Sequence, residues 1–212
     1  SPDECPATPS AQAPAELPDI RPGMAVLDLC AAPGGKATQL AARMENTGLL
    51  VANEPVRSRA ETLCGNLERL GIRNALVTCM RPDALAAALP ACFDRVLVDA
   101  PCSGEGMFRK DETAVSEWSA EHVTACALRQ RQIFESAACL LKPGGRLVYS
   151  TCTFSREENE DTVESFLAGH ADFIRMENRR LYPHTFPGEG QFMALLGKKN
   201  GGEVLSACLE RP

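Results

Sequence analysis

Two cysteines stand directly after strand-like apolar runs. Cys102 follows the run that ends at Asp99, and Cys152 follows the run that ends at Ser150. A thiolate is a strong nucleophile that forms covalent intermediates. If the two runs are neighbouring parallel strands, their carboxyl ends open onto one crevice. We therefore expect both thiols to face the same ligand.

One reaction requires a thiol beside a methyl donor. Carbon 5 of a pyrimidine is too poor a nucleophile to take a methyl group unaided. A thiolate that adds to carbon 6 turns the ring into an enamine-like nucleophile, and loss of the carbon-5 proton then expels the enzyme. An acid near ring nitrogen 3 stabilises such an adduct, and Asp99 is placed for that role. Enzymes that methylate exocyclic amines need no thiol and tend to present an Asn/Asp-Pro-Pro-aromatic turn, where this chain has Asp-Ala-Pro-Cys.

These residues require a fold that alternates strands and helices. Short apolar runs with few interruptions are typical of parallel strands buried on both faces. The pattern predicts an α/β fold, a doubly wound and mostly parallel sheet whose ligands bind at the carboxyl ends of the strands. The predicted strands are Ala25–Leu29, Leu49–Asn53, Ala75–Cys79, Arg95–Asp99 and Arg146–Ser150, and the predicted helices end at Met44, Leu70 and Leu141.

The turn after the first strand is rich in small residues. Asp28-Leu29-Cys30-Ala31-Ala32-Pro33-Gly34-Gly35-Lys36 matches neither the dinucleotide fingerprint nor the Walker phosphate loop. Its glycines allow close backbone approach to a ligand, and the following helix adds a partial positive charge. Glu54 ends the second strand, where doubly wound folds bind ribose hydroxyls. S-adenosylmethionine fits both features, because it has a ribose and an amino-acid tail but no phosphate.

Composition limits the other possibilities. The chain has 212 residues, 44% of them hydrophobic and 24% charged, which excludes a wholly disordered, collagenous or coiled-coil protein. The ten cysteines include no Cys-x-x-Cys pair, so we predict no metal site. A net charge of −6 weighs against a polyanionic partner. We expect an extended lead-in over residues 1–22, one catalytic domain over 23–200 and a tail over 201–212. The sequence opens with Ser1-Pro2-Asp3-Glu4, which suggests that the chain is a piece of a longer protein.

Three segments together resemble the Nol/Nop/Sun RNA cytosine-5 methyltransferases, most closely the bacterial branch that acts on 16S ribosomal RNA. Asp28–Lys36 resembles motif I of that family. Asp99–Lys110 resembles motif IV, and Ser150–Glu160, with its Glu-Glu-Asn-Glu run, resembles motif VI. The resemblance implies a Rossmann-like class I fold that depends on S-adenosylmethionine.

The resemblance also implies residue roles. Cys152 is the implied nucleophile, Cys102 the residue that helps release the product, and Asp99 lies by the cofactor and the target base. Glu54 would bind the ribose, and the turn residues Cys30, Ala31, Ala32, Pro33, Gly34, Gly35 and Lys36 the methionine part. The family has an acid after the third strand that contacts adenine, and Asp83 is the candidate here, placed late after Cys79-Met80-Arg81-Pro82.

The implied partner is an RNA, ribosomal rather than transfer RNA, in the cytoplasm and without a membrane. Family members bind RNA through further regions outside this core, which accommodates the acidic charge. Phe108 and Trp118 are candidates to stack on an extruded base, or else to pack locally. Basic residues predicted near the mouth are Arg109, Lys110, Arg129, Arg131, Arg179, Arg180, Lys198 and Lys199.

Two other functions stay open at this point. A non-catalytic S-adenosylmethionine-binding module for ribosome assembly would need the cofactor turn but neither thiol. A methyltransferase for free nucleotides or small molecules would use the same site without RNA. Comparing single-stranded RNA with free cytidine as substrate distinguishes this function from RNA methylation.

Overall fold

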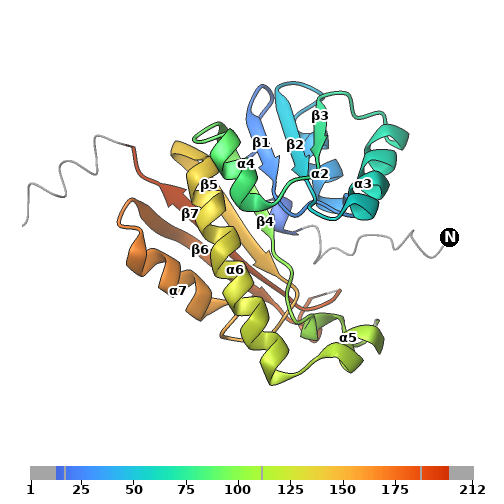
Figure 1. Cartoon of the computed structure of the whole chain (residues 1–212), viewed down its shortest axis with the longest axis vertical. Coiled ribbons are helices and arrows are strands. Elements are labelled where there is room, and N and C mark those ends of the chain that lie inside the picture. Colours follow the sequence, from blue (N-terminus) through green and yellow to red (C-terminus); the bar gives the residue numbers. More distant parts are fainter. Residues whose placement is uncertain (1–12, 17, 111, 187, 201–212) are drawn as a thin grey trace, which may run out of the picture.

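The computed structural model describes residues 13–200 except 17, 111 and 187 (Figure 1). Its centre is a seven-stranded sheet in the order β3-β2-β1-β4-β5-β7-β6. The strands β1 to β5 are parallel, whereas β7 is antiparallel to both of its neighbours. The predicted doubly wound, mostly parallel α/β fold is confirmed. The strands are β1 (Ala25–Asp28), β2 (Leu49–Asn53), β3 (Ala75–Thr78), β4 (Phe93–Asp99), β5 (Leu141–Thr151), β6 (Phe173–Leu181) and β7 (Gln191–Lys198).

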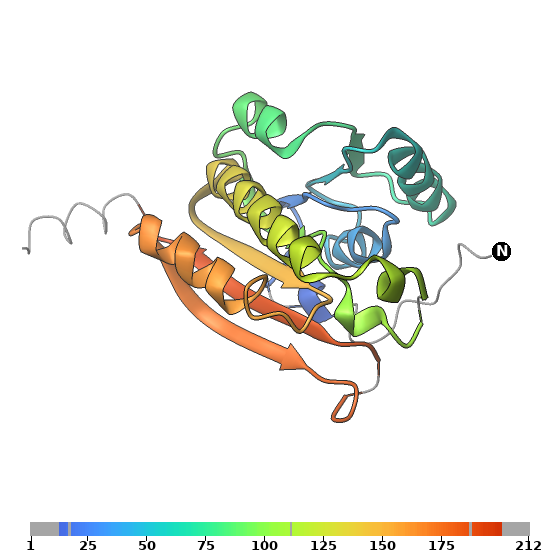
Figure 2. The same cartoon turned by 60° about the horizontal axis from the view of Figure 1, so that its bottom comes forward.

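Helices cover both faces of the sheet (Figures 1 and 2). One face packs against α4, α6 and α7, and the other against α2 and α3. Successive side chains of a strand point to opposite faces, so Val26 of β1 joins the α2 side and Leu27 the α6 side. The helices are α2 (Gly35–Arg43), α3 (Arg57–Arg69), α4 (Pro82–Ala88), α5 (Glu112–Glu117), α6 (Ala120–Leu140) and α7 (Glu160–Gly169), with 3-10 turns η1 (Ala13–Ala15) and η2 (Glu105–Met107).

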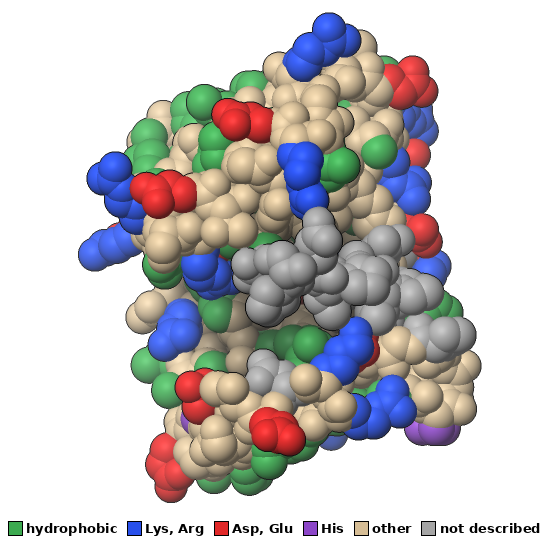
Figure 3. Space-filling view, turned by 90° about the vertical axis from the view of Figure 1, so that its right-hand side faces the viewer, with side chains coloured by type: hydrophobic (Ala, Val, Ile, Leu, Met, Phe, Trp, Pro, Cys, Tyr) green, Lys and Arg blue, Asp and Glu red, His purple; other side chains and the backbone are tan. Residues whose placement is uncertain are grey.

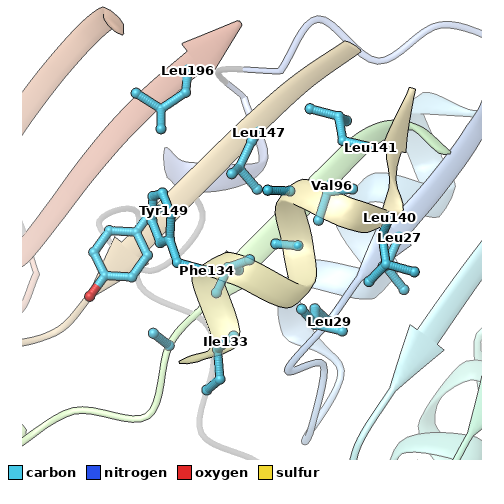
Figure 4. Close-up of a cluster of buried hydrophobic side chains, with 14 of the residues drawn as sticks. Leu27, Leu29, Val96, Ile133, Phe134, Leu140, Leu141, Leu147, Tyr149 and Leu196 are labelled. Atoms are coloured by element: carbon cyan, nitrogen blue, oxygen red, sulfur yellow. The ribbon is translucent and has the colours of Figure 1, made fainter. Parts of the chain in front are cut away.

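In the core beneath α6, the aromatic rings of Phe134 and Tyr149 lie among aliphatic side chains (Figure 4). Phe134 is fully buried and meets Tyr149 of β5 edge-on, with ring centroids 4.8 Å apart. On its other side Phe134 meets Phe166 of α7 at 4.3 Å. Edge-to-face pairs of this kind stabilise a core beyond the area they bury. This packing fixes α6 and α7 relative to β5, the strand that leads to Cys152.

The fifth strand begins earlier than predicted. Lys142-Pro143-Gly144-Gly145 was expected to separate the helix from a strand at Arg146, and α6 does end at Leu140. Leu141 already pairs with Phe93 of β4, and regular pairing resumes at Arg146 after an irregularity. The predicted strands included neither β6 nor β7, which complete the sheet beyond β5.

The predicted boundaries lie partly outside the described residues. Residues 1–12 of the predicted lead-in and the whole predicted tail, 201–212, are among those the structure does not describe. In the described part of the lead-in, Ala15 is fully buried and packs with the α2 side of the core. The Arg95 Nε–H donates to the carbonyl of Pro18. No described helix is long and apolar enough to cross a membrane.

Candidate active site

A cavity of about 990 Å³ opens at the carboxyl ends of β1, β2, β4 and β5. The strand order reverses between β1 and β4, and open α/β sheets bind ligands at such a reversal. The sequence placed its candidate residues at these same strand ends. Seven of them line the cavity wall, namely Cys30, Ala32, Glu54, Asp83, Asp99, Cys102 and Cys152.

The two thiols lie against each other in this wall. Cys102 Sγ and Cys152 Sγ are 3.2 Å apart and share a hydrogen bond. This contact with Cys152, together with burial, raises the pKa of the Cys102 thiol well above its usual value. Two thiolates at this distance would repel each other strongly. The contact therefore disfavours ionisation of both thiols at once.

Asp99 is held beside the thiols by donors from three elements. Lys36 Nζ donates to Asp99 Oδ2 at 2.7 Å, and Ser150 Oγ donates to Asp99 Oδ1 at 2.7 Å. Gln191 Nε2 reaches the same Oδ1 at 3.5 Å. Burial lowers the pKa of Lys36, but the stronger combined effect of Asp99, through charge and hydrogen bond, raises it above its usual value. Lys36 is therefore charged, and it orients the Asp99 carboxylate toward the cavity.

The turn after β1 requires small residues. The Ala32–Pro33 peptide bond is cis. Gly34 has φ +117°, a conformation that favours glycine, and an added Cβ would lie 3.1 Å from Leu63 Cδ1. The Ala31 N–H donates to the Asn53 carbonyl at 2.9 Å, which ties the turn to the end of β2. Five predicted residues of this turn do not line the cavity, namely Ala31, Pro33, Gly34, Gly35 and Lys36.

Glu54 and Asp83 differ in their surroundings, although both line the cavity. Glu54 is 2% exposed, and its Oε1 accepts the Val56 N–H at 3.0 Å. Its Oε2 lies 3.5 Å from Arg59 Nη1 and keeps acceptor capacity toward the cavity. Asp83 is exposed, and its ion pair with Arg81 lowers its pKa. Glu54 is thus the better-placed hydrogen-bond acceptor in the cavity wall, whereas Asp83 is an exposed part of that wall.

Asp28, at the end of β1, has a buried carboxyl group with few neighbours that stabilise its negative charge. Neither oxygen makes a hydrogen bond of good geometry to the described residues. Burial and the negative charge of Asp99 raise its pKa to about 7, although Lys36 opposes this shift. Burial and Asp28 also raise the pKa of the neighbouring Cys30 thiol, so Cys30 is a neutral, apolar part of the wall. The carboxyl groups of Asp28, Glu54 and Asp99 lie close enough to interact, and a cationic ligand such as a sulfonium would favour their ionised forms.

The sequence did not single out the groups that hold the two cysteine turns in place. Glu158 and Asn159 are fully buried between the turn at Cys102 and the turn at Cys152. Gln130 of α6, also fully buried, donates to both Glu158 Oε2 and the Pro101 carbonyl. The Glu-Glu-Asn-Glu run was a signal of the family, but a run of polar residues usually lies on the surface.

The predicted basic residues are not gathered in one patch. Over the face in Figure 3, Lys and Arg side chains are interspersed with Asp and Glu. Arg129 lines the cavity, and Arg109 donates to the Gly188 carbonyl. Lys198 was expected at the mouth, which is wrong: its Nζ binds the carbonyls of Ala138 and Leu141, at the opposite end of β5.

The two predicted stacking residues lie in the segment after Cys102. Phe108 is 37% exposed and Trp118 is 42% exposed. Trp118 Nε1–H donates to Glu105 Oε1 at 2.9 Å. The same carboxylate accepts the Phe154 N–H through Oε2 at 3.0 Å, so the segment is connected to the residues after Cys152.

Comparison with known proteins places this geometry in a family. The model of the family described as 16S rRNA methyltransferase RsmB/F matches residues 17–197. This chain belongs to the RsmB/F family. It is 43% identical over 190 residues to ribosomal RNA small subunit methyltransferase F of Serratia proteamaculans, and 44% identical over 199 residues to the protein of that name from Escherichia fergusonii. These matches cover 82% and 86% of the chain but 40% and 42% of the relatives, so the chain spans about two fifths of their length.

Solved structures extend the comparison. NSun6 from Pyrococcus horikoshii, solved with SFG, superposes with a TM-score of 0.81 at 30% identity, over 90% of this chain and 52% of that one. A methyltransferase homologue from the same organism has a TM-score of 0.78 at 30% identity, over 89% of this chain and 66% of that one. S-adenosylmethionine is the cofactor of this RsmB/F chain, and the cavity, with the carboxyl groups of Glu54 and Asp99 in its wall, fits it.

Proposed function

We propose that this RsmB/F chain is the catalytic core of an enzyme that methylates carbon 5 of a cytosine in 16S ribosomal RNA. The observation that supports this most directly is the thiol pair, with Cys102 Sγ 3.2 Å from Cys152 Sγ in the wall of the cavity beside Asp99. A methyltransferase that modifies oxygen or an exocyclic nitrogen has no use for a thiol at this point. Family membership favours ribosomal over transfer RNA, and hence the cytoplasm.

In the first step Cys152 is the nucleophile. Its thiolate forms a bond to carbon 6 of the cytosine, and the electron pair of the 5,6 double bond moves to carbon 5. Asp99 lies near ring nitrogen 3 and stabilises the charge that develops on the ring. S-adenosylmethionine supplies the electrophilic methyl group that carbon 5 takes up. The target base must leave its stack, because thiol and methyl group approach opposite faces of the ring.

The contact between the two thiols supports the assignment of Cys102 to product release. Before the attack, the hydrogen bond with Cys152 keeps Cys102 protonated. Once Cys152 has become a thioether, it no longer accepts that proton or presents a negative charge. Cys102 then loses its proton to solvent and removes the proton from carbon 5. The electrons of that C–H bond restore the double bond while the bond from carbon 6 to Cys152 breaks.

The cofactor occupies the rest of the cavity in this proposal. Glu54 accepts the ribose hydroxyls, the turn from Cys30 to Lys36 surrounds the methionine part, and Asp83 stands near the adenine. RNA phosphates are bound largely by regions of the protein beyond this span. Phe108 or Trp118 stacks on the extruded base. No group of side chains among the described residues is arranged to hold a metal ion.

The decisive experiment uses Cys102→Ala and Cys152→Ala, with Cys139→Ala as the matched control because Cys139 is an exposed free thiol on α6. Each variant is incubated with S-adenosylmethionine and cytosine-containing RNA and run on a denaturing gel. We expect a shifted covalent band for Cys102→Ala, none for Cys152→Ala, and normal methylation by Cys139→Ala. The reverse pattern would exchange the two roles. No adduct and no methylation in the full-length protein would favour a non-catalytic binder.

A further inference from the structure

Two adjacent buried residues hold the two cysteine turns. Glu158 and Asn159 precede α7, and both are fully buried. Their side chains bind different segments. Glu158 binds the Cys102 turn, Pro101–Ser103, and Asn159 binds the Cys152 turn, Thr151–Thr153. The spacing of the two sulfurs therefore depends on one dipeptide that touches neither of them.

Glu158 fixes the residue that follows Cys102. Its Oε2 accepts the Ser103 N–H at 3.1 Å, and its Oε1 accepts the Ser103 hydroxyl. The residue that precedes Cys102 is held through Gln130, whose Nε2 donates to Glu158 Oε2 at 2.7 Å and to the Pro101 carbonyl at 2.9 Å. Both neighbours of Cys102 are thus bound to the same carboxylate, directly or through one side chain.

Asn159 does the same for the turn at Cys152. The Thr151 hydroxyl donates to Asn159 Oδ1, and Asn159 Nδ2 donates to the Thr153 carbonyl at 3.0 Å. The two turns also meet directly, because Ser103 Oγ and Thr153 Oγ1 lie 2.9 Å apart. The Tyr149 hydroxyl donates to the Glu158 carbonyl at 2.7 Å, which anchors the dipeptide to β5.

A buried carboxylate is costly unless donors satisfy it, and Glu158 accepts three hydrogen bonds. Buried polar groups that are fully satisfied make a structure rigid. The donors come from residues distant in sequence, so the carboxylate holds the Cys102 turn relative to α6 and β5. Without an acceptor at this position, Ser103 and Gln130 would lose their partner, and the Cys102 turn would be free to shift.

We propose that Glu158 is a positioning residue for product release, which holds Cys102 close to the atom from which it takes a proton. This rests on the proposed function, in which Cys102 acts after Cys152 has attacked. Glu158 touches neither cysteine sulfur, so it acts through Ser103 and Pro101. Its loss slows release more than attack, because Asn159 still holds the Cys152 turn.

The test compares Glu158→Met with Glu157→Met, the same substitution at the neighbouring exposed glutamate. We expect Glu158→Met to lower kcat about 10- to 100-fold, the range for a lost hydrogen bond to a charged group, with KM nearly unchanged. Part of the RNA should then accumulate as covalent adduct, as with Cys102→Ala. Glu157→Met should turn over normally. Glu158→Gln should recover most of the rate, because an amide can accept from the Ser103 N–H and donate to the Ser103 hydroxyl oxygen.

A structural role without positioning would lower the melting temperature of Glu158→Met and produce no adduct. That result, or turnover equal to that of Glu157→Met, would overturn the proposal. If Glu158→Met does not fold, Ser103→Ala decides, since it removes one hydrogen-bond donor to Glu158 and is expected to accumulate adduct to a smaller extent. The same gel distinguishes failure of this proposal from failure of the proposed function, because Cys102→Ala would give no adduct if the proposed function were wrong.

Discussion

Asp28→Asn should stabilise the ligand-free protein at neutral pH while leaving it unchanged in acid. The carboxyl group of Asp28 is completely buried, and its pKa rises from 3.8 to about 7. Between these values the folded state binds more protons than the unfolded state, so the free energy of unfolding falls as pH rises. The difference between these two pKa values corresponds to about 4 kcal/mol of unfolding free energy, fully expressed above about pH 7. Asparagine has nearly the same shape and does not ionise.

The assay is urea unfolding followed by far-UV circular dichroism at several pH values. The difference in unfolding free energy between Asp28→Asn and the unaltered protein should grow by up to about 4 kcal/mol from about pH 4 to about pH 8. Asp94→Asn is the matched control, because the pKa of Asp94 is shifted in the opposite direction. Burial raises this pKa, but the hydrogen bonds from Lys142 and the Ala25 N–H together lower it by more. Its loss should therefore destabilise the protein at neutral pH, by about 1 kcal/mol or less, and have no effect in strong acid.

A pH-independent difference between Asp28→Asn and the unaltered protein would refute this reasoning. It would mean that Asp28 has the same proton affinity in the folded and unfolded states. A difference with the sign expected of Asp94→Asn would mean that Asp28 is ionised and paired, for example with Lys36. Equal urea dependences, the m-values, are needed for the comparison, since a changed m would indicate a changed unfolded state.

Two further substitutions test the site. Gly106→Ala should lower the free energy of unfolding by about 1–3 kcal/mol and remove most of the methylation rate, because its Cβ would lie 2.7 Å from the Cys152 carbonyl oxygen. Gly65→Ala is the control: it has open space around it and should stabilise α3 by about 0.5–1 kcal/mol in thermal melting. Normal methylation by Gly106→Ala would contradict this. Glu54→Ala should weaken S-adenosylmethionine binding about 10- to 100-fold in calorimetry. Asp83→Ala should weaken it less than about threefold, since Asp83 is exposed and forms an ion pair with Arg81. Equal losses would show that both acids bind the cofactor.

The parallel half of the fold could be predicted because it is encoded locally. Within the predicted strands Leu49–Asn53 and Arg95–Asp99, the segments Leu50–Asn53 and Val96–Val98 are buried, and their apolar residues pack on both helix-covered faces as expected. The antiparallel strand β7 is equally apolar, but the last predicted strand was Arg146–Ser150, so β7 was not predicted. The other added strand, β6, is largely exposed, with charged residues along Phe173–Leu181, so its sequence resembles a surface segment. Its pairing with β7 across the sheet edge is what makes it a strand.

The site could be predicted only where its residues follow a strand. Cys102 and Cys152 stand at neighbouring strand ends, and topology alone brings such ends together. Glu158 offered no such signal, because it belongs to a run of four polar residues in which Glu157 is exposed. Glu158 is buried because donors 28 and 55 positions earlier in the chain, on Gln130 and Ser103, converge on its carboxylate. Burial of a charge thus depends on partners that only the folded chain assembles, whereas strand-end placement follows from periodicity.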